Sequence, residues 1–384
     1  MSENLTPEPS NHKTARSRSQ SRKSSSPGKK FRLERLILKN FKAFDELTIA
    51  FPCPDMEGGP DILVMGSKNG LGKTSIFEAC SLLFLAANGG ENALEYISYP
   101  RTVDLLDVMI RAGRNKSQIT GTFSVDGEPF EISLTLSREG KASIEGNTTA
   151  IRQMILRTKN SRSDTANIAP RFFFSLAGLN SEPLLFSPFM YFHSYRKVQE
   201  GRLELGAMVE EERFLPRSRY QETPISIFKQ AVLRSLMSRG ELFEDFNNKE
   251  AEVILNTLNE LMEQYTGGKI ERLRPSADSK IEFRVTPVKN PSTSFNFDGL
   301  SSGQKEIIST LFLIWYYTRT QPGIVLIDEP ELHLNPEWHR GFIQHLYQLS
   351  PQNQYIIATH SEDVFSAVDK DRRILLLPNV EEVR

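Results

Sequence analysis

Residues 61–87 constrain the fold most, because an apolar strand pattern, a glycine-rich segment and a helical pattern follow one another directly. The strand pattern is DILVMG, Asp61–Gly66, and the helical pattern TSIFEACSLLFLAA begins at Thr74. We expect this helix to end near Asn88-Gly89-Gly90, where glycines favour a stop. Backbone N–H groups at a helix N-terminus attract phosphate, so this order predicts a phosphate-binding loop.

The segment between strand and helix, SKNGLGKTS, carries the groups that bind nucleotide phosphates. Its glycines allow close approach, Lys73 can bridge the outer phosphates, and Thr74 can place its hydroxyl on Mg²⁺. Ser67 stands where the usual motif has a glycine, and Gly66 can take over that backbone freedom. A chance glycine-rich turn is the alternative. The predicted ATP-binding residues of this loop are Ser67, Asn69, Gly70, Gly72, Lys73, Thr74 and Ser75.

A second apolar strand pattern ends in adjacent carboxylates, in GIVLIDEPELHLNPEWH at residues 323–339. A buried strand delivers Asp328 to the sheet edge beside the phosphate loop, where it can hold Mg²⁺ through water. Glu329 can then polarise an attacking water. We therefore predict Asp328 and Thr74 as metal ligands and Glu329 as a catalytic residue. A strand that ends in a solvated acidic turn is the alternative.

A third apolar strand pattern, QYIIATHSEDVF at residues 354–365, ends in Thr359-His360-Ser361. A histidine at such a strand end can hydrogen-bond a γ-phosphate or the attacking water. A lone histidine is more often structural, but the position of this one after the Asp-Glu strand favours a role in the site. We predict His360 as a second catalytic residue.

The stretch FDGLSSGQKEIISTLFLIWYY, residues 297–317, predicts a long buried helix. Its start, Leu300-Ser301-Ser302-Gly303-Gln304, is similar to the LSGGQ signature of ABC-type ATPases, with Ser302 in place of a glycine. Ser301 and the free N–H groups at the helix start can form an anion site. An ordinary N-capped core helix is the alternative. The predicted ATP-binding residues of this segment are Ser301, Ser302, Gly303 and Gln304.

Together these motifs resemble the ABC-ATPase superfamily, and within it the non-transporter branch of SMC, RecF and OLD-like ATPases of DNA repair and phage defence. The resemblance covers Phe31 to about Leu377, and LILKNFKAFDELTIAF looks like the strand hairpin that opens this branch. It implies an α/β fold: an ABC-type P-loop NTPase head with a mixed sheet, helices on both faces, an antiparallel β subdomain and a helical accessory lobe. It also implies ATP and Mg²⁺ as cofactors, and Glu331–Asn335 as a loop that touches a partner subunit.

The remaining segments suggest how the chain is organised. Residues 1–30 are rich in lysine, arginine and serine and poor in large apolar residues. Such a segment buries too little apolar surface to fold, so we predict a disordered basic tail. Residues 31–384 are expected to form one ATPase domain with an accessory lobe inserted at about 90–295. No sustained heptad pattern occurs between Ser75 and Leu300, which argues against the coiled-coil arm of SMC proteins.

Within the expected lobe, residues 121–137 predict a hairpin, residues 186–200 a strand that leaves the core, and residues 226–265 two helices. Gln199 is a candidate for the glutamine that senses Mg²⁺ in this superfamily. Arg196 is an equally plausible functional residue, and a plain surface turn is the alternative for both.

Composition restricts the partners and the compartment. The 47 Lys and Arg residues nearly cancel the 48 Asp and Glu residues, so the overall charge predicts neither nucleic-acid nor membrane binding. Cys53 and Cys80 are too few for a disulfide framework, which suits a reducing cytoplasm. The sequence contains neither an apolar run long enough to span a bilayer nor a hydrophobic signal core, so we expect a cytoplasmic location.

We therefore expect an ATP-hydrolysing switch that dimerises head to tail around ATP. The resemblance implies a bacterial anti-phage defence module in which this ATPase acts with a separately encoded effector, a nuclease or a toxin. After the ATPase motifs we find no carboxylate cluster of the kind a two-metal nuclease needs. A RecF-like repair ATPase that binds DNA directly and a scaffold that binds ATP without hydrolysing it are the alternatives.

Overall fold

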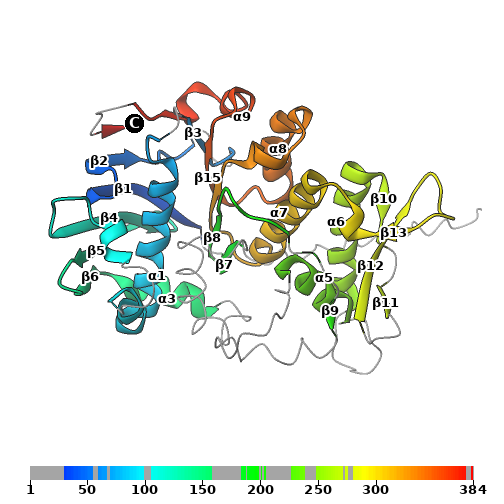
Figure 1. The fold of residues 1–384 in the computed structure, drawn as a ribbon, viewed down its shortest axis with the longest axis horizontal. Coiled ribbons are helices and arrows are strands. Elements are labelled where there is room, and N and C mark those ends of the chain that lie inside the picture. The colour runs from blue at the N-terminus through cyan, green and yellow to red at the C-terminus, as the bar shows by residue number, and fades with distance from the viewer. Residues whose placement is uncertain are drawn as a thin grey trace, which may run out of the picture.

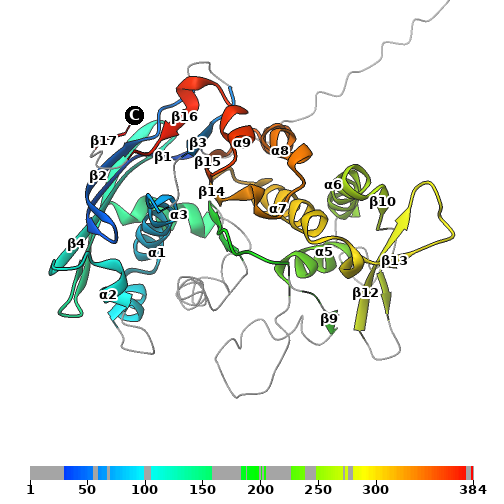
Figure 2. The ribbon, with the colours of Figure 1, turned by 45° about the horizontal axis from the view of Figure 1, so that its top comes forward.

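The computed structural model describes residues 30–54, 59–66, 70–98, 105–157, 183–186, 188–198, 200, 203–204, 226–237, 248–270, 273–275, 280–377 and 382–383. These residues form a mostly antiparallel sheet, a central and mostly parallel sheet, and a helical lobe, which follow one another along the molecule (Figures 1 and 2). The predicted basic tail lies outside the described residues, apart from Lys30.

The first sheet contains the N-terminal hairpin. Its strands, in spatial order, are β17 (Glu382–Val383), β2 (Phe44–Ala50), β1 (Phe31–Phe41), β4 (Lys116–Val125), β5 (Glu128–Ser137) and β6 (Ala142–Gly146). The predicted opening hairpin is confirmed, because β1 and β2 pair antiparallel around the turn at Lys42-Ala43. The hairpin predicted at 121–137 is confirmed as the pair of β4 and β5. Through β4, which pairs with β1 as well as with β5, this hairpin belongs to the same sheet as the opening hairpin.

The central sheet places the predicted motif strands side by side. Its strands, in spatial order, are β16 (Arg373–Leu375), β3 (Ile62–Gly66), β15 (Gln354–Thr359), β14 (Ile324–Asp328), β8 (Phe189–Phe192) and β7 (Leu184–Phe186). The pairs are parallel except for β7 with β8. Strands β3, β14 and β15 are buried along their whole length, which explains their continuous apolar runs. The segment expected to leave the core instead contributes β8, which is also buried throughout.

Helix α1 (Lys73–Ser98) lies between the two sheets (Figure 2). Its buried residues, including Phe77 and Leu83, share one core with both sheets. The predicted stop at Asn88-Gly89-Gly90 is wrong, because the helix continues through it to Ser98. A glycine in a helix interior costs about 1 kcal/mol relative to alanine, which is too little to end a helix that is anchored by a buried face. The shorter helices α2 (Leu105–Met109) and α3 (Thr148–Arg157) contact α1.

The other face of the central sheet is covered by α7 (Ser302–Thr318) and α8 (Pro336–Leu349) (Figure 1). Ile307 and Leu311 of α7 pack in one core with Val325 and Ile357 of the sheet. The long helix predicted after the signature segment is thereby confirmed. Short elements that connect the strands and helices are η2 (Phe297–Gly299), η3 (Pro330–His333), α9 (Glu362–Ser366) and η4 (Lys370–Arg372).

The helical lobe lies beyond α7. It contains α5 (Ile227–Met237) and α6 (Asn248–Thr266), which confirm the two helices predicted at 226–265. A small sheet completes the lobe, with β10 (Gly268–Lys269), β12 (Lys280–Pro287), β11 (Leu273–Pro275), β13 (Phe295–Asn296) and β9 (Leu203–Glu204). Across the described ranges, none of the helices combines the length with the apolar character that crossing a bilayer requires.

Candidate active site

The predicted phosphate loop lies between β3 and α1. The structure describes Gly70, Gly72, Lys73, Thr74 and Ser75, whereas Ser67 and Asn69 lie outside the described residues. Gly70 has a φ of +81° and Gly72 a φ of +88°, in the left-handed region that side-chain-bearing residues rarely adopt. Both positions therefore favour glycine. Lys73 and Thr74 follow Gly72 directly and are the first residues of α1.

The tip of the N-terminal hairpin closes one side of this loop. A Cβ at Gly72 would overlap the ring of Phe44, the first residue of β2. Lys42 in the hairpin turn forms an ion pair with Glu78 on α1. Burial raises the pKa of the Glu78 carboxyl group, and the Lys42 ammonium partly offsets this. The sequence predicted the hairpin but not this contact, because nothing local in either segment indicates that they meet.

The parallel strands bring the separate motifs to one edge of the central sheet. In the register of β15 with its neighbours, Thr359 pairs with Gly66 and Ala358 pairs with Asp328. The phosphate loop, the acidic turn and the histidine turn therefore leave the sheet at the same edge. Thr74 Oγ1 donates a hydrogen bond of 2.7 Å to Asp328 Oδ2. The two residues predicted as metal ligands are thus in direct contact.

Asp328 is a buried carboxylate with spare bonding capacity. Its side chain is 0% exposed, and within the described ranges its Oδ1 atom has no hydrogen-bond partner. Burial raises its pKa to about 7; the hydrogen bond from Thr74 lowers the pKa and the charge of Glu329 raises it. Hydroxyl and carboxylate oxygens are the ligands that Mg²⁺ prefers, with water and phosphate completing its shell. Thr74 and Asp328 therefore fit a Mg²⁺ ion.

Lys73, Glu329 and His360 meet beside this pair. Lys73 Nζ lies 2.8 Å from His360 Nε2, and His360 Nε2 lies 3.1 Å from Glu329 Oε1. Burial lowers the pKa of Lys73, while the charges of Glu329 and Asp328 act in the opposite direction. The site thus holds a lysine, a glutamate and a histidine at one sheet edge.

The turn after β14 has a strained backbone. Glu329 has φ 47° and ψ 61°, a left-handed conformation that costs a non-glycine residue about 1–2 kcal/mol. Its N–H group donates to the carbonyl oxygen of Ala358 (2.8 Å). Glu331 Oε1 accepts hydrogen bonds from the N–H groups of His360 (2.6 Å) and Ser361 (3.1 Å). The sequence predicted for Glu331 only a contact with a partner subunit. It did not predict these hydrogen bonds, which connect the turn after β14 to the turn after β15.

The signature residues line a different place, an open groove of about 640 Å³. They line it together with Leu332, Leu334, Asn335 and Trp338. Ser301 caps α7: its hydroxyl accepts from the N–H group of Gln304 (3.3 Å), and Gln304 Oε1 accepts from the N–H group of Ser301 (3.1 Å). The N-cap considered as the alternative is therefore present. Ser301 and Ser302 are nevertheless exposed, so a ligand can reach them.

Arg196 follows β8 and is 4% exposed. Its Nη1 atom donates to the carbonyl oxygens of Asp328 (2.7 Å) and His193 (2.9 Å), and its guanidinium forms an ion pair with Glu306 on α7. Arg196 therefore contacts the backbone of the acidic turn. Gln199, the other candidate of this segment, lies outside the described residues.

The fold and these residues define the class of the protein, a P-loop ATPase head of the ABC type. The sequence profile of an AAA domain matches residues 35–267. A second AAA-domain profile, whose description also names an AbiEii toxin and a type IV TA system, matches residues 204–366. The first match covers more than half of this chain, so the chain belongs to this AAA domain family of ATPases.

Two relatives and one solved structure extend this comparison. Retron Vc95 probable ATPase of Vibrio cholerae serotype O1 biovar El Tor is 29% identical over 138 residues, 33% of this chain and 26% of that protein. Septu protein PtuA of Bacillus mycoides (strain KBAB4) is 23% identical over 354 residues, 92% of this chain and 42% of that protein. This chain thus spans less than half of the length of the relatives it matches.

An SMC head bound to the C-winged helix domain of ScpA superposes with a TM-score of 0.53 at 15% identity. The match covers 92% of this chain and 96% of the SMC head. At this identity the likeness concerns the fold alone, and it confirms the ABC-type head that the motifs imply.

Proposed function

We propose that this chain binds ATP with Mg²⁺ and hydrolyses it, and that residues 31–384 act as one ATPase domain. The strongest support is the cluster at the edge of the central sheet. Lys73, His360 and Glu329 lie in a chain of contacts of 2.8 and 3.1 Å, beside the bonded pair of Thr74 and Asp328. A lysine, a hydroxyl and a buried carboxylate at a helix N-terminus suit a triphosphate and its metal ion.

Each residue has a distinct role in this proposal. Lys73 binds the outer phosphates and gives up its contact with His360. Glu329 accepts a proton from the attacking water as the general base. His360 donates a hydrogen bond to the γ-phosphate or orients the water. Thr74 and Asp328 hold Mg²⁺, which when bound neutralises charge on the β- and γ-phosphates.

The groove beside α7 supports a second step, in which two copies close head to tail. Ser301 and Ser302 are exposed where the N–H groups at the start of a long helix attract anions. In the proposed dimer, Ser301, Ser302, Gly303 and Gln304 of one copy contact the ATP bound by the other, and Glu331–Asn335 contacts the partner. Hydrolysis then releases the dimer, so the chain acts as a switch.

A role in bacterial anti-phage defence is the setting that the relatives support, since their names are those of a retron ATPase and a Septu protein. We propose that the chain senses infection or restrains a separately encoded effector, such as a nuclease or a toxin.

The test is ATP hydrolysis by the wild type and by Glu329→Gln. Loss of the general base predicts a fall in kcat of about 10²–10⁴-fold, while a fluorescent ATP analogue still binds to both proteins. Glu337→Gln, an exposed carboxylate at the start of α8, is the matched control and keeps full activity. Equal hydrolysis by wild type and Glu329→Gln, whether fast or absent, would contradict the proposal and favour a non-hydrolysing scaffold.

A further inference from the structure

The segment that follows β8 is attached to the signature helix by two ion pairs. The Arg196 guanidinium pairs with Glu306, and Glu200 Oε1 lies 2.6 Å from Lys305 Nζ. Lys305 and Glu306 are consecutive residues in the first turns of α7, and both are at least nine-tenths buried. The segment supplies the positive charge in the first pair and the negative charge in the second, so the four residues cannot swap partners. The segment and the start of α7 are therefore coupled in position.

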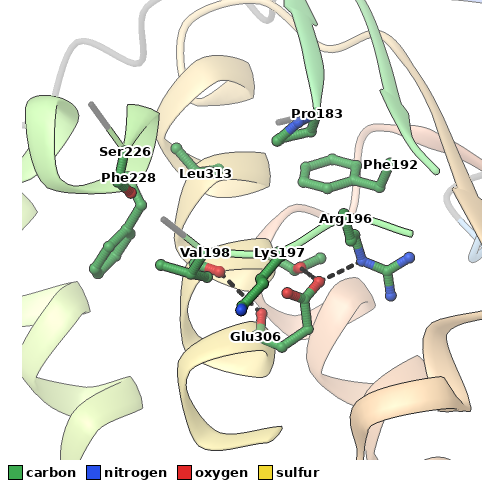
Figure 3. A pocket seen from close by; sticks show the side chains of 11 residues that line it. Pro183, Phe192, Arg196, Lys197, Val198, Ser226, Phe228, Glu306 and Leu313 are labelled. Carbon is green, nitrogen blue, oxygen red and sulfur yellow. Dashed lines mark hydrogen bonds and ion pairs between the residues drawn. The ribbon is translucent and has the colours of Figure 1, made fainter. Parts of the chain in front are cut away.

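Of the four residues in these ion pairs, Arg196 also contacts the candidate active site, at the backbone of Asp328. It lines a small pocket with Phe192 and Leu313, and the Nε side of its guanidinium faces the Glu306 carboxylate (Figure 3). Thr310 Oγ1 donates a hydrogen bond to the same carboxylate (3.2 Å). A buried charge pair of this kind is a poor source of stability but holds a defined geometry, and the planar guanidinium can serve two partners at once.

The second partner is the peptide group that joins Asp328 to Glu329. Arg196 Nη1 donates to the carbonyl oxygen of this peptide (2.7 Å), and the N–H group of the same peptide donates to Ala358 (2.8 Å). Both polar atoms of the peptide are thus fixed, one by Arg196 and one by β15. Glu329 follows immediately with its left-handed backbone. This conformation persists only where surrounding contacts outweigh its cost.

We propose that Arg196 is a positioning residue that holds Glu329 in its left-handed conformation and links this conformation to the position of the signature helix. The inference rests on the proposed hydrolysis of ATP and adds regulation to the same site. Ser301 and Glu306 belong to one helix start, so a force that the partner's nucleotide exerts on Ser301 reaches Glu306, then Arg196, and then the Asp328–Glu329 peptide. Glu329 is aligned for catalysis only when α7 lies in the position that places Glu306 against Arg196.

The test compares Arg196→Met, Arg196→Lys and Glu306→Gln with the wild type. We expect kcat to fall about 10²-fold in Arg196→Met, since small misplacements of catalytic groups have effects of this size, while KM for ATP and the affinity for a fluorescent ATP analogue change less than threefold. Arg196→Lys keeps the charge but not the planar two-partner geometry, so it stays at least tenfold impaired. Lys197→Met, the exposed neighbour, is the control and matches the wild type.

A double-mutant cycle tests whether Arg196 and Glu306 act through one shared link. Arg196→Met combined with Glu306→Gln should be no slower than Arg196→Met alone, because both changes break one link. Circular dichroism reports folding, and Glu306→Gln is the milder variant if Arg196→Met does not fold. Additive losses, a full rescue by lysine, or a rise in KM with unchanged kcat would overturn the inference.

A crystal structure of Arg196→Met tests the inference without any hydrolysis. We expect residue 329 to leave the left-handed region, and a retained φ near +47° would overturn the inference. If the wild type and Glu329→Gln hydrolyse ATP equally, the proposed function fails, and the conformation of residue 329 still decides what Arg196 does.

Discussion

Asp328 combines two conflicting demands at the scale of a single residue. Its position at the end of a fully buried strand removes it from water, yet its proposed role as a metal ligand requires the ionised form. In the metal-free protein the conflict appears as a pKa raised to about 7, mainly by burial. The carboxyl group is therefore neutral in the fold at pH values at which it is already ionised in the unfolded chain.

This difference predicts a pH-dependent effect of Asp328→Asn on stability in the presence of EDTA. Because the folded-state pKa is raised above the ordinary 3.8, the stability associated with the protonated group is complete below about pH 4. It is lost as the pH rises through about 7. The amide is always neutral, so Asp328→Asn should raise Tm by a few degrees at pH 8 and change it little at pH 4.

The measurement is thermal unfolding of the metal-free protein over this pH range. Asp371→Asn removes an exposed carboxylate and serves as the control, with no pH-dependent difference from the wild type. A Tm difference for Asp328→Asn that is the same at pH 4 and pH 8 would show that Asp328 is not the titrating group.

Gly72 carries the second prediction at this scale. Alanine there meets both an unfavourable φ of +88° and the ring of Phe44, so the loop must shift. We expect Gly72→Ala to weaken binding of a fluorescent ATP analogue at least tenfold, which corresponds to about 1.4 kcal/mol. Gly113→Ala has a similar φ of +79° but open space around it, and it should lose stability without losing nucleotide affinity. If Gly72→Ala and the wild type bound the ATP analogue equally well, the loop would not be the site that binds its phosphates.

At the scale of elements, the sequence predicted the parts whose signal is local. The strands β3, β14 and β15, the opening hairpin and α7 each carry their own apolar pattern, and parallel pairing then brings the ends of the strands together. The pairing of β4 with β1 could not be predicted, because its partners are far apart in the chain. The contacts of Arg196 and Phe44 depend on tertiary packing in the same way, so single residues without a motif carry no signal for them.

The end of α1 is the element that differs most from expectation, and it provides a sharp test. A glycine that stops a helix usually adopts a left-handed backbone, where alanine destabilises. Gly89 instead lies exposed inside α1 (Lys73–Ser98), where alanine is favoured by about 1 kcal/mol. We therefore expect Gly89→Ala to raise the free energy of unfolding, measured by urea denaturation. A decrease would mean that the helix ends at Asn88-Gly89-Gly90 after all.

At the scale of the whole molecule, the layers separate two functional surfaces. The edge of the central sheet holds Lys73, Asp328 and Glu329, while the start of α7 faces the groove of about 640 Å³. In the proposed dimer, the first surface binds the chain's own nucleotide and the second contacts the nucleotide of the other copy. Arg196 contacts both regions inside one chain, and in the proposed dimer this contact would make closure and alignment of Glu329 one event.

The most direct test of this account is the mass of Glu329→Gln in solution, measured by light scattering after gel filtration with and without ATP and Mg²⁺. We predict a doubling of the mass with ATP, and no change when Ser301→Arg is added, although this double variant still binds a fluorescent ATP analogue. A Glu329→Gln protein that binds ATP and keeps the mass of a single chain would contradict the head-to-tail closure on which the proposed switch depends.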